Sequence, residues 1–388
     1  MPPDLHMHET VAYLDHNATT ALDARVLAAM LPFLQQHGNP GSRHSFGRTA
    51  RQAIDHAREQ VAACVGAHTS QVVFTSGGTE ADNLAIQGIA AAQVPTQIAV
   101  SLIEHPAVMK PAQALQWRGW KLAKIGVDGE GRLDLDQLEQ CLQQKTGLVS
   151  VMAANNETGT LQDTAAIGAI ARRHGALFHT DAVQVLGKMP LDFGTSGAHA
   201  MSLSAHKIHG PQGAGALVLD KSVDIQPLLY GGGQEKGLRS GSENVAAIVG
   251  FGLACELAQQ GLATRNKQLR ALRERLEHGL RTMGAIIFGA GAARLPNTTF
   301  FAFPKIDGET LVMALDRKGF AVASGSACSS DSPDPSHVLL AMGIHPEIAR
   351  CAVRISLGAD NTDLQVDQCL QAIQAELLRL KQMAAIAV

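Results

Sequence analysis

Two polar segments that follow apolar runs contain residues suited to covalent and acid–base chemistry. Lys207 ends the sequence SAHK (204–207), in which the only other ionisable side chain is His206. An amine shielded from water in such a place has a lowered pKa and is a nucleophile; the alternative is an ordinary surface lysine. Asp181 follows a second apolar run and could pair with a pyridinium nitrogen, or else cap the next helix.

A glycine turn between an apolar run and a predicted helix is suited to binding phosphate. Residues 75–80 read TSGGTE, with Gly78 and Thr79 at the expected start of the helix. Backbone N–H groups exposed at a helix start and the helix dipole both attract an anion. The turn lacks the lysine of a nucleoside-triphosphate loop and the glycine spacing of a dinucleotide fold, so it favours a single phosphate.

Three more segments place polar side chains within or after apolar runs. His105, in the sequence EHP (104–106), could stack on a flat cofactor ring or be a satisfied buried histidine. Asn155 and Asn156 are costly to bury without hydrogen bonds, so they either cap a turn or contact a ligand. Arg354 lies in a predicted strand, where alternation either buries it or points it into a cleft to clamp a carboxylate.

Two loops rich in small residues complete the candidates. Cys328 lies in the sequence SGSACSS (324–330), where an exposed thiol could react; a chance loop cysteine is the alternative. The loop GGGQE (231–235) and RSGS (239–242) either moves and approaches a ligand closely or is a plain surface loop. Four further cysteines are predicted to be structural: Cys64, Cys141, Cys255 and Cys369.

Each of these features has an ordinary explanation, but their joint occurrence favours one chemistry. A phosphate turn, an acid for a pyridinium nitrogen, a reactive lysine and a carboxylate-binding arginine are the parts that a pyridoxal 5'-phosphate (PLP) enzyme acting on amino acids requires. We therefore predict a PLP enzyme in which Lys207 holds the cofactor as a Schiff base. We predict no metal site.

The elements that would position these residues alternate between apolar strands and helices. Predicted strands cover Gln71–Thr75, Gln97–Leu102, Gly147–Met152, Ala176–His179 and Ala214–Leu219, and predicted helices include Ala81–Ala92 and Thr164–His174. Such alternation predicts an α/β fold with a mostly parallel sheet covered on both faces. Ligands of such a sheet gather at the carboxyl ends of its strands.

From about Leu262 the pattern changes to a smaller α+β unit. Predicted helices cover Arg265–Arg281, Glu309–Lys318 and Asp363–Met383, and predicted strands cover Ala285–Phe288, Asn297–Phe303 and Ala352–Ser356. We expect a large domain over residues 14–262. A small domain, formed by residues 1–13 and 263–388, would carry the Cys328 loop.

The composition of the 388-residue chain argues against several classes of function. A net charge of −3 gives no electrostatic basis for binding nucleic acid or an anionic membrane, and 4% aromatic residues are few for base stacking. The sequence has no apolar run of about 18 residues and no signal-peptide pattern. Six cysteines without a CxxC pair argue against a disulfide scaffold, so we expect a cytoplasmic protein.

Short motifs from about residue 13 to 360 occur in the order typical of one family. They are YLD (13–15), ATT (18–20), TSGGTEADN (75–83), EHPAV (104–108), NNETG (155–159), DAVQ (181–184), SAHK (204–207), GGGQE (231–235), RSGSEN (239–244), SGSAC (324–328) and RISLG (354–358). In these motifs the sequence resembles the cysteine desulfurases of the NifS/IscS-like branch. The resemblance implies fold type I of the PLP enzymes, within the class V aminotransferase superfamily, with a seven-stranded, mostly parallel sheet in the large domain.

The resemblance implies a cofactor-binding role for each matching residue. Lys207 would hold the cofactor, Asp181 would keep its pyridine nitrogen protonated, and Gln184 would hydrogen-bond its ring oxygen. His105 would stack on the ring and shuttle a proton, and Asn156 would also contact the site. The phosphate ligands would be Gly78, Thr79, Ser204, His206 and, from the other subunit of a homodimer, Ser242.

For the reaction, the resemblance implies that L-cysteine is converted to L-alanine and that its sulfur passes to Cys328 as a persulfide. Asn156 and Arg354 would bind the substrate carboxylate. The sulfur would then pass to an acceptor or iron–sulfur scaffold protein, in iron–sulfur cluster assembly or another sulfur-transfer pathway.

Departures from the family pattern concern the partners more than the chemistry. Ser242 replaces a common threonine but keeps the hydroxyl, Ala359-Asp360 replace a common arginine, and longer members have a scaffold-binding tail beyond the position of Val388. The alternatives are a selenocysteine lyase, another class V enzyme such as an aminotransferase, or a partner-dependent sulfur-delivery protein. The Cys328 thiol argues against an aminotransferase, which needs no such group.

Overall fold

A seven-stranded sheet forms the centre of the larger part of the protein. The computed structural model describes residues 12–325 and 334–386; Cys328 lies outside the described residues. The strand order is β2-β8-β7-β6-β5-β3-β4. These strands are β2 (Val72–Thr75), β3 (Gln97–Ser101), β4 (Lys121–Ile125), β5 (Leu148–Ser150), β6 (Leu177–Asp181), β7 (Ala200–Ser204) and β8 (Gly215–Leu219).

The pairing of these strands confirms the predicted α/β fold with a mostly parallel sheet. Strands β4, β3, β5, β6 and β7 pair in parallel. Only β8 runs against its neighbours, β7 and β2. Strand β2 therefore points in the same direction as the parallel strands, and its end lies at the same edge of the sheet.

Helices cover both faces of this sheet, and alternate residues of each strand face opposite layers. Phe74 and Ala99 pack with helices α2 (Ser45–Cys64), α6 (Leu135–Cys141), α7 (Thr164–Arg173) and α8 (Val245–Gln260). Their neighbours Val73 and Ile98 pack with α3 (Gly78–Asn83), α4 (Ile89–Ala91) and α5 (Pro106–Ala114) on the other face. Because both faces are covered, the inner strands read as continuous apolar runs in the sequence.

Two local features differ from the sequence-based expectation. The edge strand β4 was not predicted, because four of the five residues in its sequence KLAKI are partly or fully exposed and the sequence is not an apolar run. The helix predicted over residues 81–92 is interrupted by a π-helical stretch, η2 (Leu84–Gly88), between α3 and α4. Four of the five residues in this stretch are buried, so the segment has no one-sided apolar pattern whose shift would reveal the widened turn.

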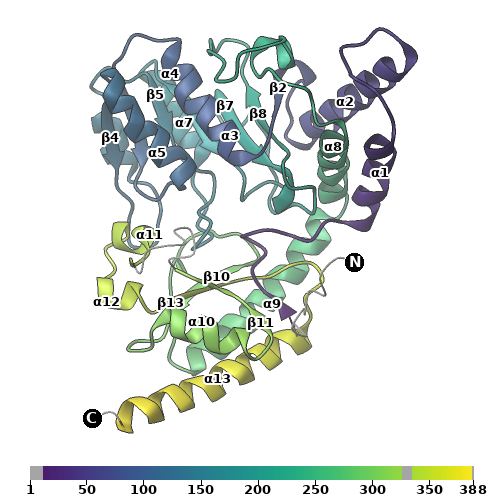
Figure 1. Cartoon of the computed structure of the whole chain (residues 1–388). Helices are drawn as coiled ribbons and strands as arrows, with labels where there is room; N and C mark the ends of the chain where they lie inside the picture. The colour runs from purple at the N-terminus through teal and green to yellow at the C-terminus, as the bar shows by residue number, and fades with distance from the viewer. Residues whose placement is uncertain (1–11, 326–333, 387–388) are drawn as a thin grey trace.

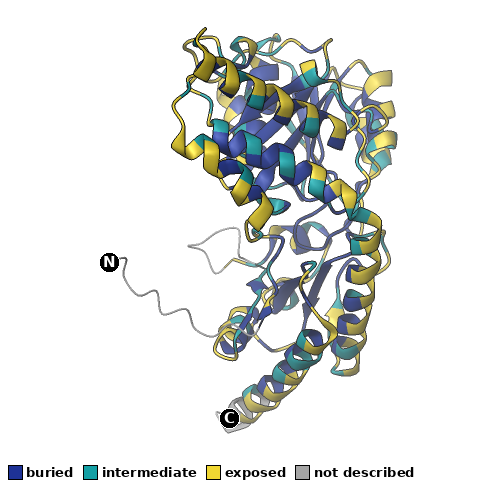
Figure 2. Cartoon of the chain, turned by 90° about the vertical axis from the view of Figure 1, so that its right-hand side faces the viewer, coloured by how far each residue is buried: buried dark blue, intermediate teal, exposed yellow. Residues whose placement is uncertain are grey.

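The smaller part of the protein contains a four-stranded antiparallel sheet, ordered β12-β13-β10-β9. The strands are β9 (Ile286–Ile287), β10 (Thr298–Ala302), β12 (Ala323–Ser324) and β13 (Ala352–Ser356). Helices α9 (Leu262–Thr282), α10 (Gly308–Asp316) and α13 (Asp363–Ile386) pack on it, with α13 at the bottom of Figure 1. Figure 2 shows the exposed outer side of these helices and the buried strands behind them.

The first described residues belong structurally to this smaller part. Strand β1 (Ala12–Tyr13) pairs in parallel with β11 (Phe320–Ala321), and Leu14 packs in the same apolar cluster as Val353 and Ile373. The chain then passes Asn17 and runs toward α1 (Ala24–Gln35) beside the large sheet. Residues 12–20 therefore connect the two sheets.

No single helix among the described residues is both long and apolar enough to cross a bilayer. Helices α8 and α9 meet the length and composition limits only as a pair, and the pair is bent by 72°.

A buried ion pair fixes the Gly-rich loop to the edge of the large sheet. Glu235 accepts two 2.7 Å hydrogen bonds from Arg58 of α2, and a 2.8 Å bond from the N–H of Phe74 in β2. The side chains of Arg58 and Glu235 are only 10% and 2% exposed. The loop is therefore held beside the strand that leads into the glycine turn.

Replacing Glu235 with glutamine should strongly destabilise the protein, because Arg58 would remain as a buried charge without its counter-ion. We expect the free energy of unfolding to fall by about 3–5 kcal/mol, measured by urea denaturation followed by circular dichroism. The control is Asp367→Asn, which removes an exposed pair with Arg275 and should cost less than about 1 kcal/mol. Equal losses in the two variants would contradict this assignment.

Candidate active site

The polar segments singled out in the sequence meet at the carboxyl edge of the large sheet. Asp181 is the last residue of β6, and Lys207 lies in the 3-10 turn η4 (Ala205–Lys207) directly after β7. The glycine turn follows β2, and His105 and Asn156 follow β3 and β5. Because all five strands point the same way, the fold gathers these side chains in one place, as expected for a parallel sheet.

The glycine turn and Ser204 form a small polar cradle. A Cβ at Gly78 would lie 2.7 Å from Cγ2 of Val183 and 3.6 Å from Cβ of Ser204, so this position tolerates only glycine. The hydroxyl of Ser204 is buried and has no hydrogen-bond partner among the described residues. An unsatisfied buried hydroxyl is costly, and an oxygen-rich ligand such as a phosphate would satisfy it. Thr79 is exposed at the start of α3.

His206 lies next to the N-terminal segment. Its Nδ1 is 3.0 Å from the hydroxyl of Thr19. Burial, followed by the charges of Lys207 and Lys188, lowers the pKa of His206 to about 4. The ring is therefore neutral near pH 7 and can contribute one N–H donor rather than a charge.

Asp181 is a buried carboxylate held in a defined orientation. One of its oxygens accepts a 2.9 Å hydrogen bond from the N–H of Val183, so it also caps the following turn. Burial raises the pKa of Asp181, whereas the nearby His105 and Lys207 lower it. A cationic nitrogen placed against this carboxylate would favour its ionised form.

His105 is the N-cap of α5, where its Nδ1 accepts a 3.1 Å hydrogen bond from the N–H of Ala107. Burial lowers the pKa of His105; the charge of Asp181 raises it, and the charge of Lys207 lowers it further. A neutral ring that accepts at Nδ1 carries its proton on Nε2, so the tautomer is set by the helix start.

Buried ionisable groups beneath Asp181 are held in their neutral forms. Asp82 and Glu104 are almost completely buried, and burial, together with the charge of Asp181, raises their pKa values well above the usual range. His179 lies between the hydroxyls of Ser150 and Ser202, at 2.8 and 2.9 Å, and burial lowers its pKa to about 3. Burial raises the pKa of Asp181 too, but Asp181 differs from Asp82 and Glu104 in having His105 and Lys207 beside it, which lower its pKa.

Lys207 points toward the N-terminal segment that connects the two sheets. Its Nζ donates hydrogen bonds of 2.6 Å to the carbonyl oxygens of both Asn17 and Ala18. The Asn17 side chain in turn donates to the carbonyl of Asn156 and to the hydroxyl of Thr298, at 3.1 and 2.9 Å. Asn17 thus joins the lysine, the β5 loop and the smaller sheet.

Arg354 lies in β13 of the smaller sheet, and its side chain extends into the same region. It is 4% exposed, as the alternation of the strand predicted, and donates to the carbonyl of Asn156 (3.2 Å) and to Asp15 (2.6 Å). Its Nε is buried without a partner among the described residues. Asn155, by contrast, caps its own turn by accepting from the N–H groups of Glu157 and Thr158.

Sequence reasoning missed Asp15, Asn17 and Lys188 as members of the site. Asp15 and Asn17 lie in or next to the motifs YLD and ATT, but their partners, Arg354 and Thr298, are hundreds of residues away. The one sequence signal for such long-range contacts is a polar residue within an otherwise apolar segment. Lys188 ends a turn that follows Asp181, and nothing in its spacing distinguishes it from a surface lysine.

One predicted site residue is not joined to this cluster, and another lies outside the described residues. Ser242 is exposed at the end of the Gly-rich loop and forms no hydrogen bond with any other described site residue. Cys328 lies outside the described residues, between Gly325 and Asp334.

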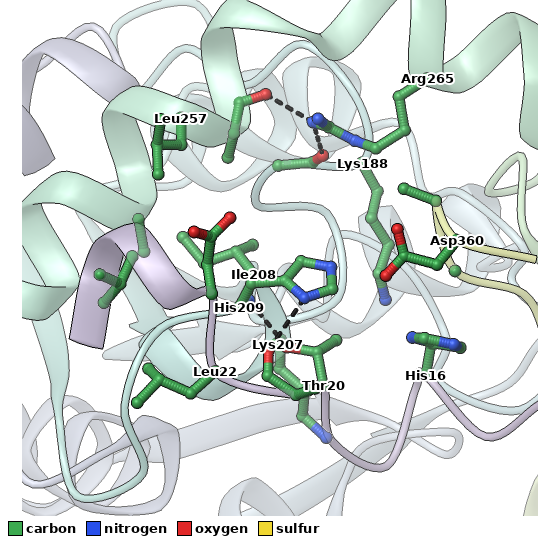
Figure 3. Close-up of a pocket in the computed structure, with 18 of the residues that line it drawn as sticks. His16, Thr20, Leu22, Lys188, Lys207, Ile208, His209, Leu257, Arg265 and Asp360 are labelled. Carbon is green, nitrogen blue, oxygen red and sulfur yellow. Dashed lines mark hydrogen bonds between the residues drawn. The ribbon is translucent and has the colours of Figure 1, made fainter. Parts of the chain in front are cut away.

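A cavity of about 460 Å³ lies beside the site, between the N-terminal segment, α8, α9 and residues 357–360. Lys207 is the only predicted cofactor residue that lines it. Figure 3 shows the polar side of this cavity, where His16, Lys188, His209 and Asp360 face the same space. The opposite wall is largely apolar and includes Leu257.

Comparison with known proteins identifies the family. Residues 12–369 match the family model described as Aminotransferase class-V. The chain belongs to this family, whose members use PLP, and within it to the cysteine desulfurases. The cradle at Gly78, the orphaned hydroxyl of Ser204 and the buried carboxylate of Asp181 fit a phosphorylated ring of this kind.

Individual relatives agree with this placement over nearly the whole chain. A cysteine desulfurase from Gluconacetobacter diazotrophicus is 44% identical over 96% of this chain and 94% of its own length. A solved structure of a NifS-like protein is 40% identical, has a TM-score of 0.89, and is matched over 94% of this chain and 99% of its own. A structure of SspA in complex with cysteine is 32% identical, with a TM-score of 0.79 and coverages of 90% and 99%. The predicted family, fold and cofactor are confirmed.

The buried His179 should make the protein sensitive to acid. Its pKa is about 3 when folded and about 6.5 when unfolded, so between these values the unfolded chain binds the extra proton. Stability is therefore lost as the pH falls below about 6.5. In His179→Asn the pH dependence of the unfolding free energy between pH 6.5 and 4 should lessen by about one proton, measured by urea denaturation at several pH values.

The matched control for this experiment is the exposed His56, replaced by asparagine in the same way. It should leave the pH dependence of unfolding as in the unaltered protein. An undiminished pH dependence in His179→Asn would show that another group is responsible.

Proposed function

We propose that this chain converts L-cysteine to L-alanine and transfers the sulfur to its own Cys328 as a persulfide. The observation that carries the proposal is the meeting of Lys207, the buried carboxylate of Asp181 and the buried Arg354 at one edge of the large sheet. An amine, an acid for a ring nitrogen and a carboxylate ligand are what a PLP enzyme needs for an amino-acid substrate.

The cofactor site follows from this arrangement. PLP, when bound, withdraws electrons from the Cα of an amino acid and makes its proton acidic. In our proposal Lys207 links to the cofactor, Asp181 keeps the ring nitrogen protonated, Gln184 donates to the ring oxygen, and His105 stacks on the ring and shuttles a proton. Gly78, Thr79, Ser204 and His206 bind the phosphate, together with Ser242 of a second subunit.

The substrate carboxylate would be bound by Arg354 and Asn156. The guanidinium of Arg354 is oriented by Asp15 and by the carbonyl of Asn156, and its buried Nε remains to be satisfied. A carboxylate in this position is held by a charge-assisted hydrogen bond. The freed amine of Lys207 then removes the Cα proton, since its Nζ is held at the same segment by Asn17.

The sulfur transfer needs no additional reagent. The thiolate of Cys328 attacks the sulfur of cysteine, the Cβ–S bond breaks, and the electron pair that leaves with Cβ is protonated to give alanine. One molecule of cysteine and one thiol yield one molecule of alanine and one persulfide, so atoms and electrons balance.

The oligomeric state, the domain boundaries and the sulfur acceptor are also part of our proposal. We propose a homodimer, supported by exposed apolar side chains on α1 (Leu27, Leu31 and Leu34) and by exposed Tyr230 beside the Gly-rich loop. We further propose a large domain over residues 14–262 and a small one over 1–13 and 263–388. The persulfide would pass to an acceptor or iron–sulfur scaffold protein in the cytoplasm.

Lys207→Ala should abolish the absorbance band of lysine-bound PLP, because the other lysine of the site, Lys188, is held by hydrogen bonds to Gln184 and Asn17. The measurement is the absorbance spectrum after incubation with PLP, with and without borohydride reduction. Lys124→Ala, a change in edge strand β4 away from the cluster, should keep the band. A band in Lys207→Ala that borohydride still reduces would refute the assignment.

Cys328→Ala should keep the PLP absorbance but lose alanine formation from cysteine, because the sulfur acceptor is missing. The measurements are alanine release and mass-spectrometric mapping of the persulfide. Cys141→Ala is the control, since that thiol hydrogen-bonds Gln97 and burial raises its pKa. Full turnover in Cys328→Ala would exclude Cys328 as the acceptor.

A further inference from the structure

We propose that Lys188 is a positioning residue of the cofactor site, which orients the side-chain amides of Gln184 and Asn17. This inference rests on the proposed role of Gln184 as donor to the cofactor ring oxygen. It assigns Lys188 no contact with the cofactor itself. Its effect passes through the two amides.

Lys188 is a buried amine without an acidic partner. It is 7% exposed, and no carboxylate of the described residues forms an ion pair with it. Burial, followed by the positive charges of Lys207 and Arg354, lowers its pKa well below the usual range. Burying an amine in such surroundings costs stability, so a contribution to the site is the better explanation for its presence.

The hydrogen bonds of Lys188 decide which way the Gln184 amide faces. Its Nζ donates to Oε1 of Gln184 at 2.8 Å. The amide nitrogen therefore faces the other way, where it donates to the carbonyl of Asn17 at 3.1 Å. An amide nitrogen has two hydrogens, so a second one remains for the ring oxygen of the cofactor. With the amide flipped, two oxygens would face each other and repel.

The same amine orients Asn17. Nζ of Lys188 donates to Oδ1 of Asn17 at 2.9 Å, which leaves the amide nitrogen of Asn17 for the carbonyl of Asn156 and the hydroxyl of Thr298. The carbonyl of Asn17 accepts from both Gln184 and Lys207. Lys188 thus sets the donor direction of Gln184 on the cofactor side, and together with Asn297, which donates to the same Asn17 oxygen at 3.1 Å, that of Asn17 on the substrate side.

The cavity beside Lys188 allows the positioning role to be tested by substitution, because it offers a control residue and room for a longer side chain. Lys188 and Arg265 are both cations that line this cavity (Figure 3). Arg265 donates only to the backbone carbonyls of Gly187 and Ala258, and to no predicted cofactor residue. Arg265→Met is therefore a matched control for Lys188→Met. The open space also leaves room for the longer side chain of Lys188→Arg, which keeps the donors.

The measurement is the pH midpoint of the PLP absorbance band in the holoenzyme. A hydrogen-bond donor to the ring oxygen stabilises negative charge on that oxygen. The proton shared between this oxygen and the Lys207 nitrogen therefore dissociates at a lower pH. Lys188→Met should lose this effect and raise the midpoint by about one pH unit or more. Lys188→Arg should restore most of the original midpoint, and Arg265→Met should leave it unchanged.

A double-mutant cycle tests whether the effect passes through Gln184. In a Gln184→Leu background, adding Lys188→Met should produce little further shift. An unchanged midpoint in Lys188→Met, or a full shift in the Gln184→Leu background, would overturn the proposal. If Lys188→Met does not fold, Lys188→Gln, which is too short to reach both amides, must still raise the midpoint.

The outcomes also separate this inference from the proposed function. An unaltered protein that shows no titrating PLP band would refute the proposed cofactor site. A normal band whose pH midpoint stays the same in every Lys188 variant would refute only the positioning role.

Discussion

The burial of the large sheet on both faces is the constraint on which the rest of the structure depends. Strands such as β3, β5, β7 and β8 have no exposed residues, so they cannot carry solvated polar groups along their length. Polar side chains within the strands, such as His179 and Ser202, must therefore hydrogen-bond one another, whereas polar groups that serve a ligand lie at the strand ends, which parallel strands bring to one edge. The reactive cluster is a direct result of this geometry.

Burial also determines the charges at that edge. Asp82, Glu104 and His179 lie beneath the cluster and are held neutral because ionisation without water is costly. Asp181 remains as the carboxylate next to the cationic Lys207 and the imidazole of His105. The layer of neutral groups prevents other charges from competing with Asp181 for a ligand nitrogen.

Local patterns in the sequence predicted strands β3, β5, β6 and β8, helices α7, α9, α10 and α13, and the residues that follow the strands. They failed where the structure depends on contacts between distant residues. Strand β4 is exposed on one edge and so carries no apolar run, and the contacts of Asp15 with Arg354 and of Lys188 with Asn17 join residues far apart in the chain. The resemblance to the family identified the roles of single residues, but not the hydrogen-bond network that orients them.

The pairing of the N-terminal segment with distant parts of the chain has a consequence for biosynthesis. Ala12 pairs with Phe320, Asp15 with Ser356 and Arg354, and Asn17 with Thr298. A ribosome makes residues 12–20 well before these partners: Thr298 follows Asn17 by 281 residues, and Arg354 follows Asp15 by 339. The nascent chain can therefore assemble its large sheet, whose last strand along the chain is β8, before the lysine and arginine sides of the catalytic centre meet, because this meeting requires β10 and β13.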